Sequence, residues 1–243
     1  MSSTLVFRQV NKYFGQYHAL RDFSATIEAG ESVGLLGLNG AGKTTLIRSL
    51  LDLNRIDGGN IEIRGVPHTQ TRARADLSYL AEGFQPPPFA TGFELVRYVL
   101  VLGGHAFSRA AVCREAEALE LDVSALSRPV REYSKGMVQK LGLITCILPK
   151  ARLLVLDEPM SALDPKARAL FRARLGELSR DGTGMFFSTH LLADVETMCD
   201  RVLILDQGQL LFDGSVDELH RRFDGTSLEG AFLAVLDAAG TEA

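Results

Sequence analysis

The chain has 243 residues, of which 46% are hydrophobic and 23% are charged, which is enough to bury one large globular core or two small ones. The formal net charge of −4 excludes the overall basic balance that would indicate a nucleic-acid partner. Its three cysteines, Cys113, Cys146 and Cys199, form no CxxC motif, so neither a disulfide framework nor a zinc site is indicated, and a reducing, cytosolic compartment fits. No signal peptide or apolar run of about 20 residues is seen, so we expect a soluble protein that can still dock on a membrane protein.

The first third of the chain is predicted to be mostly strand, with a turn at GQ and another at EAGE. A Gly-rich loop interrupts it and is followed by a helical run over residues 43–53. The segment FQPPPFATG is expected to be a loop, because three consecutive prolines continue neither a helix nor a central strand. The expected strands cover residues 4–10, 23–28, 32–36, 60–64 and 77–81.

The middle of the chain is predicted to be helical, since 93–102 and 109–121 carry apolar residues at three- and four-residue spacing. After it, strand and helix alternate, and RLLVLD is a continuous apolar run typical of a buried parallel strand. This order predicts an α/β core with a helical insertion between its halves. The remaining expected strands cover 152–157, 184–190 and, around a turn at 207–208, 202–214; the remaining expected helices cover 135–148, 164–180, 191–200, 215–223 and 227–240.

A phosphate-binding loop is predicted at Gly37 to Thr44, where GLNGAGKT matches G-x-x-x-x-G-K-[ST] between an apolar strand and a helix. Glycines let backbone N–H groups wrap phosphate oxygens, and the helix N-terminus adds partial positive charge. Lys43 would reach the β- and γ-phosphates, and Thr44 would bind Mg²⁺. The alternative is a Gly-rich turn without a ligand. The motif alone implies a nucleoside triphosphate but fits a GTPase, a small-molecule kinase or a motor equally.

Two carboxylates and a histidine follow later strands. RLLVLDEP delivers Asp157 to a strand end, where it suits a role near Mg²⁺, and Glu158 could orient or deprotonate an attacking water. The alternative is a strand-ending turn at DEP. His190 follows the strand GMFFST and could hold the γ-phosphate and the water in register, although a lone histidine is more often structural.

YSKGMVQK, residues 133–140, opens an apolar helix. Ser134 is expected to cap this helix, which is the simple interpretation. A helix N-terminus with a Ser hydroxyl and a bare Gly backbone is also an anion site. Because the phosphate loop of the same chain already holds its own nucleotide, the stretch is interpreted as a site for the γ-phosphate bound by a second subunit.

Taken in order, GLNGAGKTT, YSKGMVQK, LLVLDEPMSALDP and STH resemble the nucleotide-binding subunit of an ATP-binding cassette (ABC) transporter. The resemblance spans residues 5–223. It implies an α/β ABC ATPase fold: a P-loop NTPase core with an antiparallel β-subdomain and an inserted α-helical subdomain. The implied domain covers 1–223, with the helical subdomain at about 82–150, and 224–243 form a short C-terminal helical tail.

The resemblance also implies roles for individual residues, with ATP and Mg²⁺ as ligands. Glu158, His190 and Lys43 would be catalytic, and Thr44, Asp157 and Glu82 would face the metal. Phe14 matches the aromatic that stacks on adenine, with Tyr13 as the weaker candidate; the alternative for Phe14 is a core aromatic. The implied nucleotide-binding residues are Phe14, Gly37, Leu38, Asn39, Gly40, Ala41, Gly42, Lys43, Thr44 and Thr45, with Ser134, Gly136 and Asp164 of the SALD loop at the dimer interface.

The sequence departs from the family pattern in two places. Glu82 stands where a glutamine that touches the metal and the membrane partner is usual, and Gln85 follows three residues later, so either could fill that role. The signature, commonly LSGGQ, is YSKGM here, with Lys135 and Met137 at its third and fifth positions. These variants and the tail SLEGAFLAVL resemble two-component exporters, in which a separate polypeptide supplies the membrane helices.

This resemblance implies two partners: a second copy of the chain, which sandwiches two ATP molecules, and a membrane permease that holds the protein on the cytoplasmic face. A groove in the helical segment and the apolar loop FQPPPFATG would meet the permease, unless that loop packs on its own domain. The competing readings are a non-transport ABC ATPase of DNA repair or translation and a nucleotide-sensing regulatory subunit. The chain has a single cassette and no long coiled coil, which argues against a repair or translation ATPase. It keeps both Glu158 and His190, which argues against a regulatory subunit with little turnover.

Overall fold

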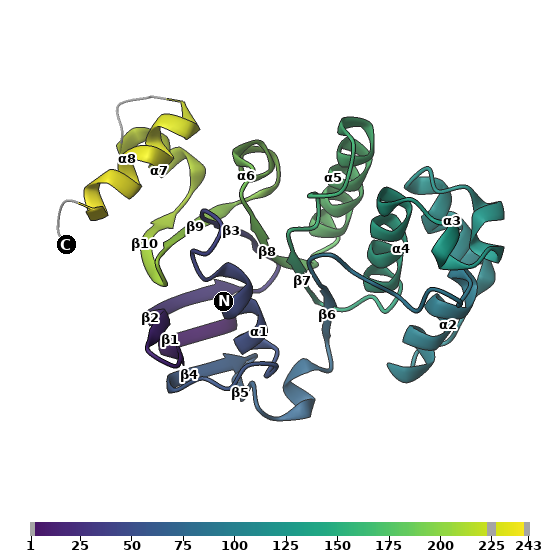
Figure 1. Cartoon of the computed structure of the whole chain (residues 1–243), viewed down its shortest axis with the longest axis horizontal. Helices are drawn as coiled ribbons and strands as arrows, with labels where there is room; N and C mark the ends of the chain where they lie inside the picture. Colours follow the sequence, from purple (N-terminus) through teal and green to yellow (C-terminus); the bar gives the residue numbers. More distant parts are fainter. Residues whose placement is uncertain (1–2, 223–226, 241–243) are drawn as a thin grey trace.

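The computed structural model describes residues 3–222 and 227–240, so the expected boundary between domain and tail at 223/224 lies outside the described residues. Two sheets lie one above the other on one side of the molecule, and a group of helices extends from their other side (Figure 1). This agrees with the predicted α/β core, its antiparallel sheet and its helical insertion. The strands are β1 (Ser3–Phe14), β2 (Tyr17–Glu28), β3 (Ser32–Leu36), β4 (Gly58–Ile63), β5 (Val66–Pro67), β6 (Leu77–Leu80), β7 (Leu153–Asp157), β8 (Gly184–Thr189), β9 (Arg201–Asp206) and β10 (Gln209–Gly214).

The larger sheet has the order β10-β9-β3-β8-β7-β6, and its strands from β9 to β6 are parallel. β3, β7 and β8 are buried along their whole length, because layers cover both faces, which explains why their sequences are mainly apolar. β10 pairs antiparallel with β9 through a tight turn at Gln207–Gly208, where both residues have positive φ, as a two-residue hairpin of this kind requires. The carboxyl ends of β3, β7 and β8 therefore meet along one edge, where ligands bind in open α/β sheets.

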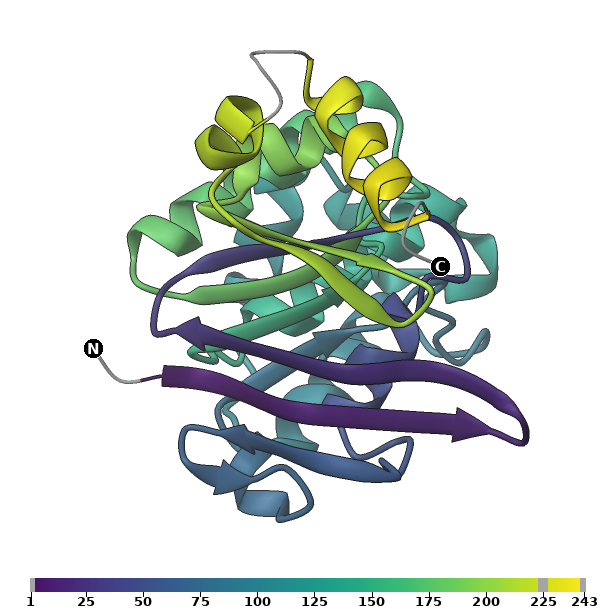
Figure 2. The ribbon, with the colours of Figure 1, turned by 90° about the vertical axis from the view of Figure 1, so that its left-hand side faces the viewer.

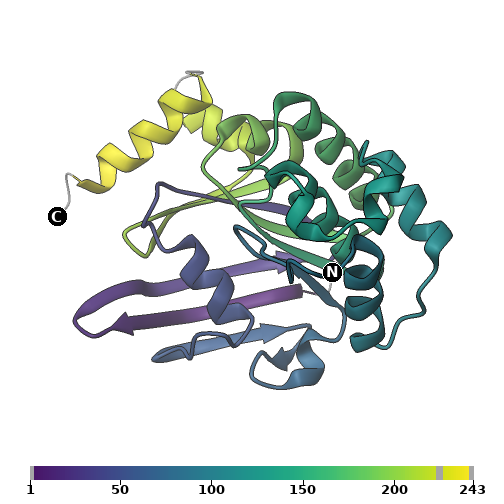
Figure 3. The same cartoon turned by 45° about the vertical axis from the view of Figure 1, so that its right-hand side comes forward.

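The smaller sheet is antiparallel, with the order β2-β1-β4-β5. Helix α1 (Lys43–Leu50) runs between the two sheets (Figure 3) and buries Leu46, Ile47 and Leu50 against both. The β1–β2 hairpin is longer than predicted, since it continues to Phe14 and begins again at Tyr17. Several register shifts interrupt the alternation of apolar and polar residues along this hairpin. The part of the hairpin near its turn therefore lacks the two-residue period from which a strand is predicted.

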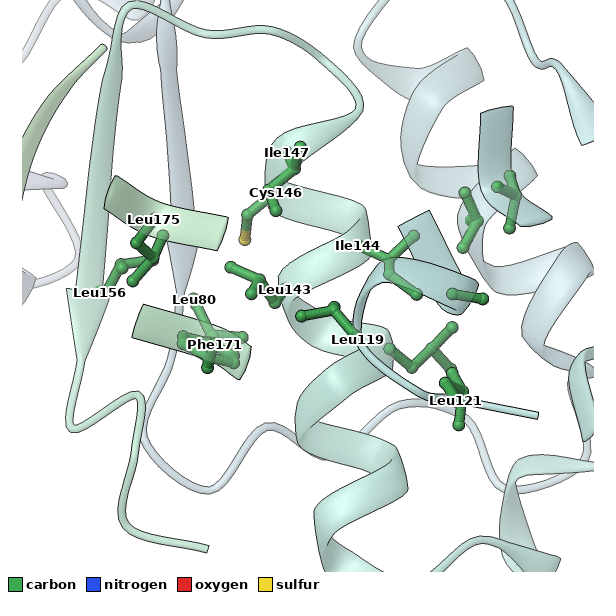
Figure 4. Packing of buried hydrophobic residues seen from close by; sticks show 14 of the residues in the cluster. Leu80, Leu119, Leu121, Leu143, Ile144, Cys146, Ile147, Leu156, Phe171 and Leu175 are labelled. Carbon is green, nitrogen blue, oxygen red and sulfur yellow. The ribbon is translucent and has the colours of Figure 1, made fainter. Parts of the chain in front are cut away.

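The helical insertion lies between β6 and β7 and forms the right-hand part of Figure 1. Thr91 begins α2 with a capping box to Glu94, and Ser108 caps α3. Ser134 caps α4, which is the one cap of the three that the sequence predicted. Figure 4 shows how α4 joins this part to the core: Leu143 and Cys146 face Leu156 and Phe171. The insertion contains α2 (Gly92–Leu102), α3 (Arg109–Ala118) and α4 (Lys135–Ile147), with 3-10 turns at Val123–Ser127 and Val130–Glu132.

The last helices cover the larger sheet from the side opposite the smaller one (Figure 2). Leu228, Ala231 and Phe232 of the final helix pack on Ile204 and Phe212 of the β9–β10 hairpin. Within the described residues, no helix combines the length and apolarity that crossing a bilayer would require. These helices are α5 (Pro165–Arg180), α6 (Leu192–Met198), α7 (Val216–Arg222) and α8 (Leu228–Gly240).

Two predicted helices end three residues earlier than expected, and α6 is also shorter, since it covers Leu192–Met198 rather than 191–200. α1 ends at Leu50 rather than at residue 53, and α3 ends at Ala118 rather than at residue 121. In each case a residue with positive φ follows, Asp52 after α1 and Glu120 after α3, and this conformation stops a right-handed helix. The short strand β5 and a 3-10 turn at Thr71–Arg74 were not predicted, since both are shorter than a recognisable period.

Candidate active site

The Gly-rich loop joins β3 to α1 at the carboxyl edge of the larger sheet. It passes so close to its neighbours that a side chain would not fit: a Cβ on Gly37 would lie 2.4 Å from the Leu205 carbonyl oxygen, and one on Gly42 would lie 2.8 Å from that of Ala19. Gly42 also has φ of +110°. By contrast, nothing lies within 4 Å of a Cβ built on Gly40. The loop is therefore packed on one side and open on the other, as a backbone cradle for an anion must be.

Lys43, the first residue of α1, folds back under this loop. Its Nζ donates to the carbonyl oxygens of Gly37 at 2.7 Å and Leu38 at 3.2 Å. The same Nζ lies 3.4 Å from Glu158 Oε1, and both side chains are more than nine-tenths buried. A buried ammonium group is thus held at the floor of the loop by a carboxylate and two carbonyl groups. All three partners can be exchanged for a stronger anionic ligand.

Asp157 ends β7 and is fully buried. Its Oδ1 accepts hydrogen bonds from Ser188 Oγ at 2.5 Å and from Thr44 Oγ1 at 3.3 Å, whereas its Oδ2 has no partner. Burial raises the pKa of Asp157, while the hydrogen bonds from Ser188 and Thr44 oppose that rise. A buried carboxylate oxygen without a partner, beside a hydroxyl group, suits a hard divalent cation such as Mg²⁺.

Asp157→Asn is expected to stabilise the ligand-free protein at neutral pH, because it removes a buried charge. The pKa of Asp157 is raised on folding, so its ionisation costs no stability below the ordinary value of 3.8; the cost grows as pH rises toward the raised pKa and is constant above it. Thermal unfolding without nucleotide or divalent cation should show a midpoint higher by a few degrees at pH 7, a gain that shrinks as pH is lowered.

The matched control for this prediction is Asp122→Asn. Hydrogen bonds from Ser124 lower the pKa of the exposed Asp122 carboxyl, so its replacement should not stabilise the protein. An Asp157→Asn variant that unfolds at a lower temperature than the parent at every pH would show that ionisation of this carboxylate costs no stability.

Glu158 follows Asp157 and adopts a left-handed backbone conformation, with φ of +47°, which is unfavourable for a residue with a side chain. Its N–H donates to Ser188 Oγ at 2.9 Å. Its Oε2 lies 2.8 Å from His190 Nδ1, and its Oε1 lies beside Lys43. A carboxylate held between an ammonium group and an imidazole, at the edge of an open pocket, is placed to accept a proton from a water molecule.

Lys43, Thr44, Glu158 and His190 line one pocket of about 580 Å³, whereas the predicted site residues Gly37, Ala41 and Asp157 are not among its lining residues. Most of the predicted site residues lie together in this pocket. The pocket also favours one candidate for the aromatic that stacks on adenine and one for the position that a glutamine usually fills in the family. Phe14, 49% exposed, lines it, whereas Tyr13 stacks on His18 with ring centroids 3.9 Å apart; Glu82 lines it, whereas Gln85 does not. Phe14 is therefore not a core aromatic. The lining residues are Phe14, Tyr17, Ala19, Leu38, Asn39, Gly40, Gly42, Lys43, Thr44, Thr45, Glu82, Glu158, Ser161 and His190.

The predicted signature residues lie outside this pocket. Ser134 Oγ accepts from the backbone N–H of Met137 at 3.2 Å, so the capping prediction is confirmed, and Ser134 and Lys135 are both exposed. Neither Gly136 nor Asp164 lines the pocket, and Asp164 caps α5 through the N–H of Ala167. The chain therefore presents these groups to solvent rather than to its own phosphate loop.

Sequence reasoning missed three polar residues at the site. Tyr17 lines the pocket, and its hydroxyl lies 3.5 Å from the Gly40 carbonyl oxygen. Gln139 of α4 is buried, and its Nε2 donates to the Pro159 carbonyl oxygen at 2.8 Å, which ties the helix behind Ser134 to the turn behind Glu158. Ser188 contacts both carboxylate residues. The position of Gln139 next to the apolar run of α4 was the one signal available for any of them.

Comparisons with known proteins agree with this geometry. A family model described as ABC transporter matches residues 20–161. The chain is 38% identical over 207 residues to an uncharacterized ABC transporter ATP-binding protein of Nostoc sp., covering 83% of this chain and 61% of the relative, and 36% identical over 208 residues to one of Synechocystis sp., covering 83% and 58%. It therefore spans about three fifths of the length of these relatives. A Nod factor export ATP-binding protein I of Burkholderia lata is 35% identical over 217 residues, covering 86% of this chain and 70% of the relative.

Two solved structures resemble the whole fold. The structure of an ATP-binding subunit of an ABC transporter superimposes with a TM-score of 0.87 at 29% identity, covering 96% of this chain and 99% of the other. A dimeric post-hydrolysis state of the ATP-binding cassette MJ0796, bound to ADP and Pi, has a TM-score of 0.80 at 21% identity, covering 87% and 98%. At that identity, the second likeness shows the fold alone.

Proposed function

Because the chain belongs to the ABC transporter family, as one of its ATP-binding proteins, we propose that it hydrolyses ATP to drive export through a separate membrane subunit. The observation that carries this proposal is the single pocket in which a glycine cradle, Lys43, Glu158 and His190 converge. ATP is the substrate that fits: phosphates for the cradle, a base for the exposed ring of Phe14, and a water molecule for Glu158.

Each residue of the pocket has a separate task in this proposal. The open side of the glycine loop would bind the phosphates through its N–H groups, and Lys43 would leave Glu158 for the γ-phosphate. That exchange would free Glu158 Oε1 to accept a proton from the attacking water, while His190 keeps hold of Oε2. Lys43 therefore neutralises Glu158 before substrate arrives and the phosphate charge afterwards.

Thr44 and Asp157 are the residues proposed to hold Mg²⁺, and the exposed Glu82 at the pocket wall is a third candidate. The unpartnered, buried Oδ2 of Asp157 supports this assignment. When bound, Mg²⁺ would neutralise part of the charge that develops on the phosphate oxygens.

A second copy of the chain is proposed to complete the site with Ser134, Gly136 and Asp164. The support is geometric. These three residues do not line the pocket of their own chain, and Ser134 and Lys135 at the N-terminus of α4 are exposed to solvent. An exposed helix N-terminus can bind an anion. In a symmetric pair of chains, the N-terminus of α4 in each chain would face the phosphates bound by the other chain, which gives two complete sites. Gln139 links α4 to the turn after Glu158, so it would couple closure of the half-site at Ser134 to closure of the half-site at Glu158.

The membrane subunit is proposed to dock on the helical insertion, which would place the protein on the cytoplasmic face of the membrane. Phe84 of the loop FQPPPFATG packs on the core, but Phe89 is 75% exposed. On α2, Tyr98, Val101 and Leu102 are each at least 60% exposed, an unusual apolar stripe for a solvated helix. Export is the direction suggested by the relatives described as Nod factor export proteins.

Purified protein should release phosphate from ATP only when Mg²⁺ is added, which is the test of the enzymatic half of the proposal. Co-purification from detergent-solubilised membranes should recover a polypeptide with several hydrophobic spans, which tests the transport half. A chain that binds nucleotide but never releases phosphate, with or without membranes, would instead support the nucleotide-sensing alternative.

Phe14→Ala is expected to weaken ATP binding about fivefold to tenfold, which corresponds to about 1 kcal/mol, the range expected for the loss of one stacked ring. Tyr13→Ala is the matched control, because Tyr13 has similar exposure and stacks on His18 instead of lining the pocket. Titration with a fluorescent ATP analogue measures both. Equal weakening in the two variants would remove Phe14 from the proposed base site.

A further inference from the structure

Ser188 carries a buried hydroxyl group that is hydrogen-bonded to both carboxylate residues of the site, Asp157 and Glu158. It is fully buried near the end of β8 and lies opposite Asp157 of β7 in the parallel register. Its Oγ donates to Asp157 Oδ1 at 2.5 Å and accepts from the backbone N–H of Glu158 at 2.9 Å. The bond to Asp157 is short and involves a carboxylate, so it is strong for its type, and the bond from Glu158 has the ordinary length of an N–H···O hydrogen bond.

The second of these bonds acts on an unfavourable backbone. Glu158 has φ of +47°, a conformation that residues with a side chain keep only when their surroundings impose it. The N–H of Glu158 would point elsewhere in an extended strand, and its carboxylate would then leave Lys43 and His190. Ser188 is the side chain that holds this N–H, and the first bond anchors the same hydroxyl to Asp157.

We propose that Ser188 is a positioning residue for ATP hydrolysis, which holds Asp157 and Glu158 in one fixed relation without touching the substrate itself. The proposal rests on the proposed function and adds a residue to it. One hydroxyl donates to the carboxylate that would face the metal and accepts from the residue that would activate the water. Losing that hydroxyl should therefore impair the chemical step more than nucleotide binding.

The test compares three single variants in phosphate release and in nucleotide affinity with and without Mg²⁺. Ser188→Ala should lower kcat about tenfold to a hundredfold, the range expected for the loss of a hydrogen bond to a charged group, and leave nucleotide affinity within about twofold. Ser188→Thr keeps the hydroxyl and should restore most of kcat. Ser32→Ala is the matched control: it also deletes a buried hydroxyl from a central strand, but this one donates to the Met198 carbonyl oxygen at the other end of the sheet.

Two further readouts separate a positioning role from a merely structural one. If Ser188 acts through Glu158, adding Ser188→Ala to a Glu158→Gln variant should change its residual hydrolysis by less than about twofold, because the two losses are not additive. Ser188→Ala alone should also prolong the lifetime of the ATP-bound dimer, measured by dilution and light scattering. Thermal unfolding within a few degrees of the parent confirms that each variant is folded.

The outcomes separate this proposal from the proposed function. A Ser188→Ala variant with the kcat of the parent, or one whose loss is fully additive with Glu158→Gln, overturns the positioning role while ATPase activity stands. A Ser188→Ala loss that Ser32→Ala reproduces would make it a general effect of deleting a core hydroxyl and also overturn the role. A parent protein that releases no phosphate overturns the proposed function and, with it, this role.

Discussion

Glu158→Gln is expected to lower ATP hydrolysis by about a hundredfold or more while ATP binding is kept. General-base or water-orienting groups contribute about 10²–10⁴ to rate, and glutamine cannot accept the proton. Its shape is nearly the same, and its amide can still pair with His190. Because the buried partner of Lys43 loses its charge, the ammonium group becomes more available to phosphate, so ATP affinity should be equal to or higher than that of the parent.

Phosphate release and ATP titration on the same preparation measure both expectations. Glu177→Gln is a suitable control, since Glu177 is an exposed carboxylate of α5 that pairs with Arg174 far from the pocket. A Glu158→Gln variant that hydrolyses ATP at the rate of the parent would exclude Glu158 as the group that activates water.

Lys43→Met should produce the largest loss of nucleotide binding. A hydrogen-bonded charge on phosphate is worth about 1.5–3 kcal/mol, so ATP affinity should fall about tenfold to more than a hundredfold. The ligand-free protein should also become less stable, because Glu158 then keeps a buried charge without its ammonium partner. Methionine retains the buried stem, so the loss can be attributed to the charge.

A double variant separates these two effects. Lys43→Met/Glu158→Gln should recover the stability that Lys43→Met loses, since neither buried charge remains, but it should not recover ATP affinity. Lys140→Met controls for the loss of a lysine, because Lys140 bonds to the Glu120 carbonyl oxygen on the helical insertion. Unaltered ATP affinity in Lys43→Met would show that the loop binds phosphate through its backbone alone.

The parts of the site that were predictable from the sequence depend on short-range order. The phosphate loop needs only a strand, six loop residues and a helix in sequence, and Ser134 caps a helix whose first turn follows at once. β7 and the apolar part of β8 were predicted because a strand covered on both faces is mainly apolar. These features can be recognised in the sequence without knowing which strands lie side by side in the fold.

The remainder depends on pairings between distant segments. Ser188 meets Asp157 only because β8 lies beside β7 in a particular register, and a shift of one residue would turn its hydroxyl to the other face. Gln139 reaches Pro159 because α4 packs against β6, the strand that lies beside β7. The choice between Glu82 and Gln85 likewise depended on where the chain turns after β6, which three prolines and a loop of irregular structure leave open to sequence reasoning.

In the proposed mechanism each chain carries two halves of different ATP sites, and the mass of Glu158→Gln in solution shows whether two chains complete them. Without nucleotide, sedimentation should give the 26.5 kDa of one chain, and with saturating Mg·ATP it should give twice that mass. Adding Gly136→Asp should prevent the doubling, because it places a carboxylate where the phosphate of the partner would bind, in a position where a Cβ meets nothing closer than 3.8 Å. A single-chain mass for Glu158→Gln at ATP concentrations that saturate its pocket would show that ATP does not join two chains.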